Sequence, residues 1–400
     1  MLVSAAMLAL SAPTAEAAEP RVHSGHLPHG HTHAPGEIDE DHGPLLLQLT
    51  YTGEIMGNAS GGLKRGARYL DNLDIVFEAD MDRLVGWRGA QVHVYGLYNN
   101  GTSVSALAGD TQAISNIETG VSALRLYEAW IEQKIGNKVS LKAGLYDLNS
   151  EFDALDAAGL FVSSPHGIGT DFAQSGRNGP SIFPSTSLAA RLDVTPAEGW
   201  KIRAAILDGV PGNPERPGHT TVRLGHGDGA LLVGELEAPL GGGKLLAGHW
   251  RYTAAFERND ARGAGKGNSG TYVRGELPLA RSDGRTVDAF LRLGHASGRY
   301  NMFDFFTGAG VKFSGWIPGR DADEFGIAVA AAFTAASYRA AMGAAASEIA
   351  IEATYRTPLT SWLAVQPSLH YIHRPSADPG IPGALVLGLR AEASFSLLGF

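Results

Sequence analysis

The sequence predicts an all-β protein, a transmembrane antiparallel β-barrel of about sixteen strands. Glycine is frequent, at 52 of 400 residues, and charged residues make up 18%, below the roughly 25% of an average soluble domain. After the first twenty residues there is no apolar run of the ~18 residues that a transmembrane helix needs. Many short alternating segments, separated by Gly, Asn, Asp, Ser and Pro, remain, and this pattern is typical of a membrane-spanning barrel.

The two ends of the chain indicate export and insertion. Residues 1–17 are apolar and small, and Ala15-Glu16-Ala17 fits a signal-peptidase site, so this stretch is expected to be a signal peptide. A buried N-terminal segment is the alternative. Phe400 follows an alternating run and resembles the signal that the bacterial barrel-assembly machinery reads. The predicted division is a signal peptide (1–17), a flexible His-rich periplasmic segment (18–44) and the barrel (45–400).

The segment before the barrel holds six of the fourteen histidines within a stretch dense in Pro and Gly. Such a composition cannot form a packed core, so the segment is expected to be disordered, as a tail or plug. Imidazoles spaced two or three residues apart can bind Zn²⁺, Cu²⁺ or Ni²⁺ weakly, and the candidates are His23, His26, His29, His31 and His33. The alternative is a tail that is merely rich in histidine. No other cofactor is expected.

From Leu45 onward, alternating segments succeed one another to the end of the chain. We predict sixteen strands, an even number as in bacterial single-chain barrels. They are 45–55, 71–83, 90–98, 123–135, 138–146, 187–195, 200–208, 230–238, 244–255, 270–280, 286–296, 307–315, 324–334, 348–357, 363–373 and 384–397.

Alternation within these segments separates a lipid face from a lumen face. Lipid cannot satisfy backbone hydrogen bonds, so a spanning sheet must close on itself. A charge on the lipid face costs about 2–4 kcal/mol at the midplane, and charged residues are therefore assigned to the lumen. This rule places Arg191, Arg203, Arg292 and Arg390 inside, and in 244–255 it places His249 and Arg251 inside, opposite Leu246, Trp250 and Tyr252. A soluble β-sandwich would also alternate, but it is seldom cut into sixteen strands.

Connections of two lengths separate the strands. Short polar turns such as Glu198-Gly199 and 241–243 suit the periplasmic side, whereas 99–122, 147–186, 209–229 and 256–269 suit outer loops. The longest, 147–186, is expected to fold into the lumen and narrow the pore, with a short helix in 152–162. A surface lid or a disordered loop is the alternative.

Three blocks of the sequence resemble the carbohydrate-selective porins of the OprB family. The first, residues 51–101, contains Gly61-Gly62, then Asp74, Asp80 and Asp82, the turn Gly86-Trp87-Arg88-Gly89, and Asn100-Gly101. The second is LRLYEAWIEQKIGNKVSLKAGLYDLNSEF, and the third is IAIEATYRTPLTSWLAVQPSLHYIHRP with the closing LGLRAEASF. The resemblance implies a sixteen-stranded pore in the outer membrane of a Gram-negative bacterium, embedded in its lipid. It implies a constriction of charged and aromatic groups, and facilitated diffusion of monosaccharides such as glucose into the periplasm.

Sugar selectivity requires paired donors and acceptors whose contacts are weak enough for fast passage. Arginine donates to vicinal hydroxyls through its planar fork, and carboxylates accept from them. The candidate pore-lining residues are Arg125, Glu128, Lys142, Arg191, Arg203, Glu235, Arg274, Glu276 and Arg292. Phe152, Asp153 and Asp156 would join them if the long loop folds inward. Arg125 and Glu128 have opposite parity, so a bulge is needed for both to face the lumen, and Trp130 is assigned to the lipid interface.

The composition and motifs of the chain also bear on other functional classes. The chain has no cysteine, which excludes thiol catalysis, and its net charge of −9 argues against a nucleic-acid partner. No GxSxG elbow or paired His and Ser is evident, so an outer-membrane enzyme is not expected. Many of the positions assigned to the lumen are Arg or Lys, so a general or anion-preferring porin remains an alternative. A closed surface-binding barrel, and a pore coupled to metal uptake through the histidines, also remain as alternatives.

Overall fold

The sheet closes into a barrel in which every strand pairs antiparallel with its neighbours, β1 pairing with β18 to complete the ring. The computed structural model describes residues 43–222, 224–225 and 227–399. Residues 1–42 and Phe400, which carry the predicted signal peptide, the candidate metal-binding histidines and the terminal signal, lie outside the described residues. Among the described residues, no helix is long and apolar enough to cross a membrane.

Sixteen strands form the barrel, which confirms the predicted fold. They are β1 (Leu45–Ser60), β2 (Gly66–Asp80), β3 (Ala90–Asn100), β4 (Ser122–Ile135), β5 (Val139–Tyr146), β6 (Ser187–Val194), β7 (Lys201–Asp208), β8 (Ala230–Leu240), β9 (Gly243–Tyr252), β12 (Ser269–Ser282), β13 (Arg285–Ala296), β14 (Phe303–Ser314), β15 (Glu324–Thr334), β16 (Ser347–Pro358), β17 (Leu363–His373) and β18 (Ala384–Gly399).

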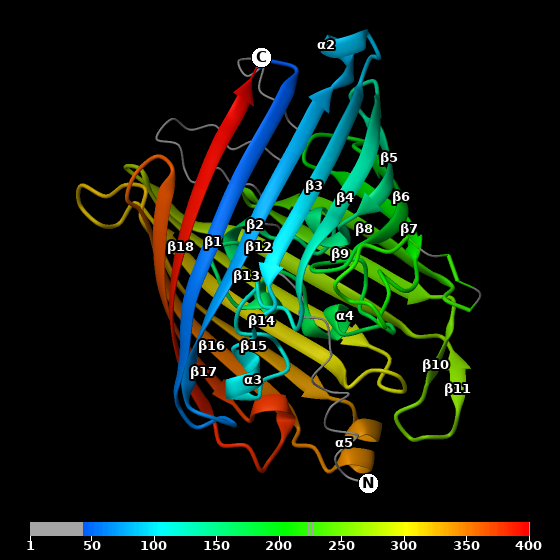
Figure 1. Ribbon diagram of the computed structural model, residues 1–400, viewed down its shortest axis with the longest axis vertical. Coiled ribbons are helices and arrows are strands. Elements are labelled where there is room, and N and C mark those ends of the chain that lie inside the picture. Colours follow the sequence, from blue (N-terminus) through cyan, green and yellow to red (C-terminus); the bar gives the residue numbers. More distant parts are fainter. Residues whose placement is uncertain (1–42, 223, 226, 400) are drawn as a thin grey trace.

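The connections differ sharply between the two ends of the barrel (Figure 1). One end, which we call the short-turn end, carries the tight turns and α2 (Met81–Val85). The other, the long-loop end, carries α3 (Ser105–Ala108), α5 (Ala336–Met342), the 3-10 turn η5 (Pro375–Ala377) and a hairpin of β10 (Ala255–Glu257) and β11 (Ala264–Lys266). This hairpin begins at Ala255, the last residue of the predicted strand 244–255, and continues into the stretch 256–269 that was predicted as an outer loop.

Tryptophans mark the membrane boundary at the short-turn end. Trp87, Trp200, Trp316 and Trp362 each lie in or beside a short turn, and each side chain is exposed. Between the ends, the outward faces of the strands carry exposed Leu, Ile and Val side chains, such as Ile55, Ile206 and Leu387. Interfacial aromatic rings above an apolar band are what a lipid-embedded barrel presents.

The loop between β5 and β6 folds into the lumen, as predicted. It contains the 3-10 turns η2 (Leu148–Ser150), η3 (Asp156–Ala158) and η4 (Ser164–His166) and the helical turn α4 (Thr170–Ala173). The helix expected in 152–162 is therefore only the single turn η3. The loop 101–121 also turns inward and hydrogen-bonds to it, from Asn116 N to Val162 O (2.9 Å) and between Ser164 N and Ala113 O (3.1 Å).

Small residues on the inner wall make room for this loop. A Cβ at Gly294 would lie 2.4 Å from Asp171 Oδ1, and one at Gly326 would lie 2.8 Å from the Phe161 ring. Neighbouring lumen positions on β15 are alanines, including Ala328, Ala330 and Ala332, all buried. The loop therefore packs closely against β13–β15, and the space that it leaves open lies beside β1–β9 toward the short-turn end.

On β9 the predicted orientation is wrong. Leu246, Trp250 and Tyr252 are buried inside the barrel, whereas His249 and Arg251 are exposed on its outer face. The reason is that the lumen is dry here: Phe172 of the loop stacks on Trp250, with ring centroids 5.0 Å apart and an interplanar angle of 6°. The loop covers these inward apolar side chains of β9 and excludes water from them.

Candidate functional site

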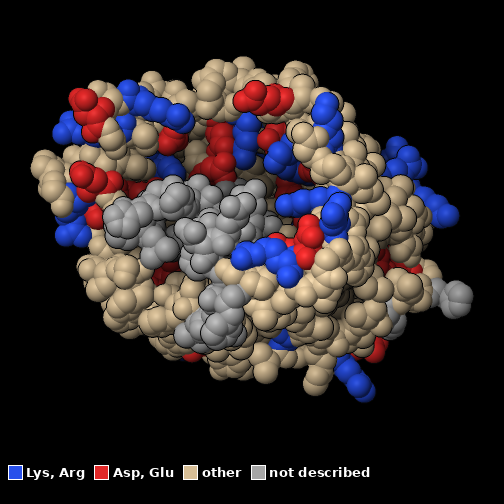
Figure 2. Space-filling model, turned by 90° about the horizontal axis from the view of Figure 1, so that it is seen from above, with Lys and Arg blue, Asp and Glu red and all other residues tan. Residues whose placement is uncertain are grey.

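A cavity of about 690 Å³ enters the barrel from the short-turn end. Its wall is formed by the inward faces of β1–β9, and its floor by the start of the 147–186 loop. Viewed from this end, the barrel is hollowed and Lys, Arg, Asp and Glu side chains surround the opening (Figure 2). We call this space the vestibule.

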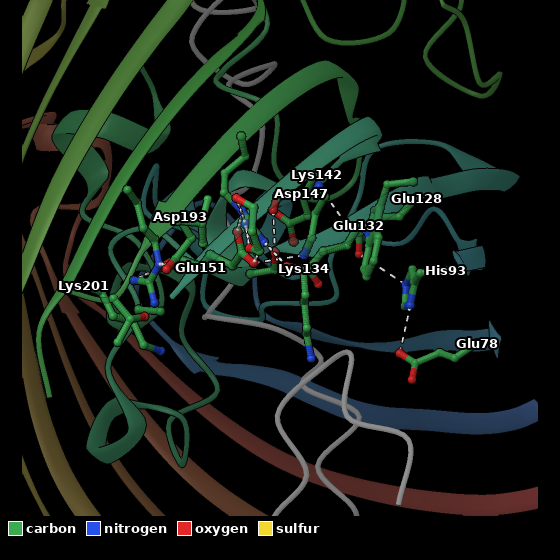
Figure 3. Close-up of a pocket in the computed structure, with 18 of the residues that line it drawn as sticks. Glu78, His93, Glu128, Glu132, Lys134, Lys142, Asp147, Glu151, Asp193 and Lys201 are labelled. Atoms are coloured by element: carbon green, nitrogen blue, oxygen red, sulfur yellow. Dashed lines mark hydrogen bonds and ion pairs between the residues drawn. The ribbon is translucent and has the colours of Figure 1, made fainter. Parts of the chain in front are cut away.

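Glu151, on the loop, is the centre of the vestibule's charge network (Figure 3). Its carboxylate accepts from Lys142 Nζ (2.9 Å) and from both Nε and Nη2 of Arg191 (2.6 Å each). Arg191 Nη2 also lies 2.9 Å from Glu132 Oε1. Two cations on β5 and β6 thus hold one loop carboxylate, and the loop is fixed to the wall at the edge of the open space.

Electrostatics differ between two loop carboxylates that lie four residues apart. Burial opposes charge on Glu151, but Lys142 and Arg191 outweigh it and hold the pKa of that carboxyl well below its usual range. Burial, together with the neighbouring Glu128 carboxylate, raises the pKa of Asp147 to about 7. Glu151 is therefore ionised at neutral pH, whereas Asp147 is partly protonated.

Arg203, on β7, forms a second network beside the first. Its Nε lies 2.8 Å from Asp193 Oδ2, and its Nη1 lies 3.1 Å from Glu235 Oε1 and 3.3 Å from Glu237 Oε2. Nη1 also donates to the carbonyl oxygen of Glu151 (2.9 Å). Like Arg191 in the first network, Arg203 meets more than one acceptor.

An aromatic row crosses β3–β5 on the same wall. Trp130 stacks on His93, its register partner on β3, with centroids 4.6 Å apart and an interplanar angle of 7°. Lys142 Nζ, from β5 on the other side, lies 3.9 Å from the Trp130 ring centroid. His93 Nδ1 in turn lies 3.0 Å from Glu78 Oε1. The prediction of a lipid-facing Trp130 is wrong, because this ring is buried and lines the vestibule.

Asp153 anchors the loop to the opposite wall. Its carboxylate accepts from Arg274 Nε (2.5 Å) and Nη2 (2.8 Å) and from Arg292 Nη1 (2.6 Å). All three side chains are fully buried. Arg274 and Arg292 were predicted to line the pore, but they lie beneath the loop and hold it in place.

Wall carboxylates also cap the loop's backbone amides. Glu235 Oε2 accepts from Asp153 N (2.8 Å), and Glu276 Oε2 accepts from Ala157 N (2.7 Å). Glu352 accepts from the backbone N–H groups of Val162 (2.7 Å) and Ser163 (2.9 Å). Glu235 and Glu276, two further sequence candidates, are thus loop anchors in this structure.

All nine predicted wall residues face the interior of the barrel, but they do not form one site. Glu128, Lys142, Arg191 and Arg203 meet at the vestibule. Arg125 lies toward the long-loop end, where its Nη2 donates to Pro217 O (2.8 Å) of the 209–229 loop. The bulge required by its parity is present, because the pairing with β3 shifts at Tyr127, between Leu126 and Glu128. Whether any of these side chains contacts a permeating solute stays a prediction.

The remaining loop candidates also separate. Phe152 is fully buried in the apolar cluster around Trp250, and Asp156 lines the vestibule with Oδ2 3.2 Å from Lys244 Nζ. Glu132 and Glu151 were not singled out by sequence. A signal for Glu132 existed: once the bulge has reset the parity, it lies on the same face as Glu128. Glu151 has no such signal, because it lies in a loop.

Metal sites are not evident in the described residues, where no group of three or more His, Asp or Glu side chains could hold an ion. The five histidines proposed to bind metal lie outside these residues.

A comparison with protein families decides the identity. The profile described as "Carbohydrate-selective porin, OprB family" matches residues 64–395, most of the chain. The protein belongs to the OprB family of carbohydrate-selective porins.

Individual relatives agree with this OprB assignment. Porin B of Pseudomonas aeruginosa is 22% identical over 87% of each chain. The "High pH structure of Pseudomonas putida OprB" superposes with a TM-score of 0.77, covering 88% of this chain and 94% of that one at 19% identity. Salmonella typhi OmpF, in a complex with daunomycin, gives a TM-score of 0.58 at 12% identity, covering 90% of this chain and 100% of that one. At these identities the structural matches show the fold alone.

Family and fold together define the general role of this OprB-family protein. It is an outer-membrane carbohydrate porin of a Gram-negative bacterium, a channel rather than an enzyme.

Proposed function

We propose that this porin passes monosaccharides such as glucose into the periplasm by facilitated diffusion. The observation that carries the proposal is the internal pairing of charge at the vestibule. Eight carboxylates and seven Lys or Arg side chains line it, and most of them pair with each other. A wall of this kind has little net charge but many polar edges, so it favours a neutral, hydroxyl-rich solute over an ion.

The paired groups match the chemistry of a sugar. A guanidinium beside a carboxylate offers a donor next to an acceptor, as vicinal hydroxyls require. Arg191 with Glu132 (2.9 Å) and Arg203 with Glu237 (3.3 Å) present such edges on neighbouring strands. Because both partners of each pair already satisfy one another, a sugar replaces contacts rather than creating them. Binding then stays weak, as passage demands.

Aromatic contact with the solute falls to tyrosines in this proposal. Trp130 has His93 on one side and Lys142 on the other, so its ring faces are occupied. Tyr95 and Tyr127 line the same space, with their hydroxyls donating to Asp74 (2.6 Å) and Asp147 (2.7 Å). Their ring edges are the apolar surface that a sugar would meet.

Single-channel recording tests the proposal. In a planar bilayer the ion conductance should be small and should fall as glucose is added. Arg191→Lys keeps the charge but removes the fork, so glucose should block it at least several-fold less strongly while the open conductance changes little. Arg88→Lys, an exposed residue outside the vestibule, is the matched control. A conductance indifferent to glucose in the unmodified protein contradicts the proposal.

A general or anion-preferring porin is the second candidate. Lys134, Lys138 and Lys201 line the vestibule and make no ion pair with a carboxylate in the described part of the chain. Cations of this kind would draw anions to the mouth. The reversal potential in a KCl gradient separates the two candidates. A strong preference for chloride supports the anion-preferring porin, whereas nearly equal permeability to K⁺ and Cl⁻ supports the sugar porin.

A further inference from the structure

Three polar side chains form a row on the outer surface of the barrel, across β9, β12 and β13. His249, Thr271 and His295 are direct register partners on these adjacent strands, and all three are exposed. His249 Nδ1 lies 3.0 Å from Thr271 Oγ1. Arg251 and Ser269, also register partners, lie one outward position nearer the long-loop end. We call these five residues the outer polar patch.

The patch interrupts an otherwise apolar face. Below it on the same strands, the outward positions are Leu245 and Ala247 on β9, Val273 on β12, and Leu291 and Leu293 on β13. Arg251 is one residue from the end of β9 and His295 one residue from the end of β13. At about 3.3 Å per residue, the patch lies within roughly 10 Å of the long-loop end.

This depth makes a cation on the lipid side tolerable. An outward Arg costs about 2–4 kcal/mol at the bilayer midplane but only about 0–1 kcal/mol near the interface. The long-loop end of an outer-membrane barrel faces the cell exterior, so the patch is level with the headgroups of the outer leaflet.

We propose that the outer polar patch binds the phosphate groups of the outer-leaflet glycolipid, lipopolysaccharide. Arg251 supplies a planar fork that matches a phosphate, and it has no carboxylate partner among the described residues. The imidazoles and the Thr271 hydroxyl add donors beside it. None of the five residues is acidic, so nothing in the patch repels an anion.

The flanks of the patch suit the rest of such a lipid. Leu232 on β8 is the register partner of Arg251, and Phe305 on β14 is the register partner of His295. Both are apolar and exposed, at 41% and 40% of their surface. When a phosphate of lipopolysaccharide is bound at the outer polar patch, the acyl chains of the same molecule would lie along the apolar band below.

Lipid titration of the purified porin in detergent tests the assignment. Native mass spectrometry would measure binding of intact lipopolysaccharide, of enzymatically dephosphorylated lipopolysaccharide and of phosphatidylglycerol. The glycolipid should bind at least tenfold more tightly than either of the others. Equal binding of the dephosphorylated form would overturn the role of phosphate, and equal binding of phosphatidylglycerol would overturn the choice of glycolipid.

Variants locate the site. His249→Leu/Arg251→Leu should lose about tenfold or more in affinity for lipopolysaccharide. His373→Leu, which removes an exposed outward histidine at the same end of β17, is the matched control and should bind normally. Both variants place leucine on the lipid-facing surface of the barrel. Single-channel conductance equal to that of the unmodified porin would verify that each variant is folded. Undiminished binding by the double variant would overturn the proposal.

Discussion

Asp153→Asn is expected to free the pore-narrowing loop from the wall. In the unmodified protein, the Asp153 carboxylate neutralises Arg274 and Arg292, and all three groups are fully buried. Asparagine keeps the shape but removes the charge, and it turns an amide N–H₂ toward two guanidinium donors. Removing one partner of a buried ion pair costs about 3–5 kcal/mol, because the remaining charge stays buried without compensation.

That cost would change the loop's opening equilibrium by about two to four orders of magnitude, since ~1.4 kcal/mol is a factor of ten. The same loop offers a matched control in Asp156→Asn. Asp156 lies 3.2 Å from Lys244, but its side chain is 54% exposed, and exposed pairs contribute only about 0–1 kcal/mol.

Single-channel recording and heat denaturation measure the outcome. Asp153→Asn should raise the open conductance and add slow current fluctuations. It should also lower the melting temperature, which is measured as the temperature at which the folded barrel no longer migrates faster than the unfolded chain in gel electrophoresis. Asp156→Asn should change these properties little. If Asp153→Asn has the conductance and melting temperature of the unmodified porin, the loop does not depend on this anchor.

Three further substitutions probe the same structure. Glu151→Gln should leave Lys142 and Arg191 without their shared carboxylate and shift the reversal potential toward anion selectivity, whereas the exposed Glu198→Gln should not; equal shifts would refute this. Gly294→Ala should destabilise the folded protein by about 1–3 kcal/mol, because its Cβ would lie 2.4 Å from Asp171, while Gly275→Ala, whose nearest neighbour is 3.6 Å away, should be tolerated. Burial raises the pKa of Asp171 to about 7, so its charged form is disfavoured in the folded protein. That penalty is full above pH 7 and fades toward pH 4. Asp171→Asn should therefore raise the melting temperature at pH 8 more than at pH 5, and a gain that does not depend on pH would count against the argument.

Local alternation was sufficient to place the strands, but it could not always tell the inside from the outside. The rule that charges face the lumen holds for Arg191, Arg203 and Arg292, where the opposite face meets lipid. It fails on β9, because Phe172, some eighty residues earlier in the chain, stacks on Trp250 and excludes water from this part of the lumen. A contact of that range leaves no trace in the local pattern.

The candidate site shows the same limit. Sequence identified four residues of the vestibule: Arg191 and Arg203 from the parity of their strands, and Glu128 and Lys142 from the block that resembles the OprB family. It could not separate them from Arg274 and Arg292, which have the same parity but lie beneath the loop. Only the path of the loop through the lumen distinguishes a wall residue that meets solute from one that meets Asp153.

Proteoliposome swelling with three solutes of one carbon skeleton tests whether balanced charge in the vestibule selects a neutral sugar. Glucose is neutral, gluconate is an anion and N-methylglucamine is a cation, and their sizes are nearly equal. Selection by balanced charge predicts that glucose enters fastest and that both ions enter several-fold more slowly. Entry of gluconate at the rate of glucose or faster would contradict it.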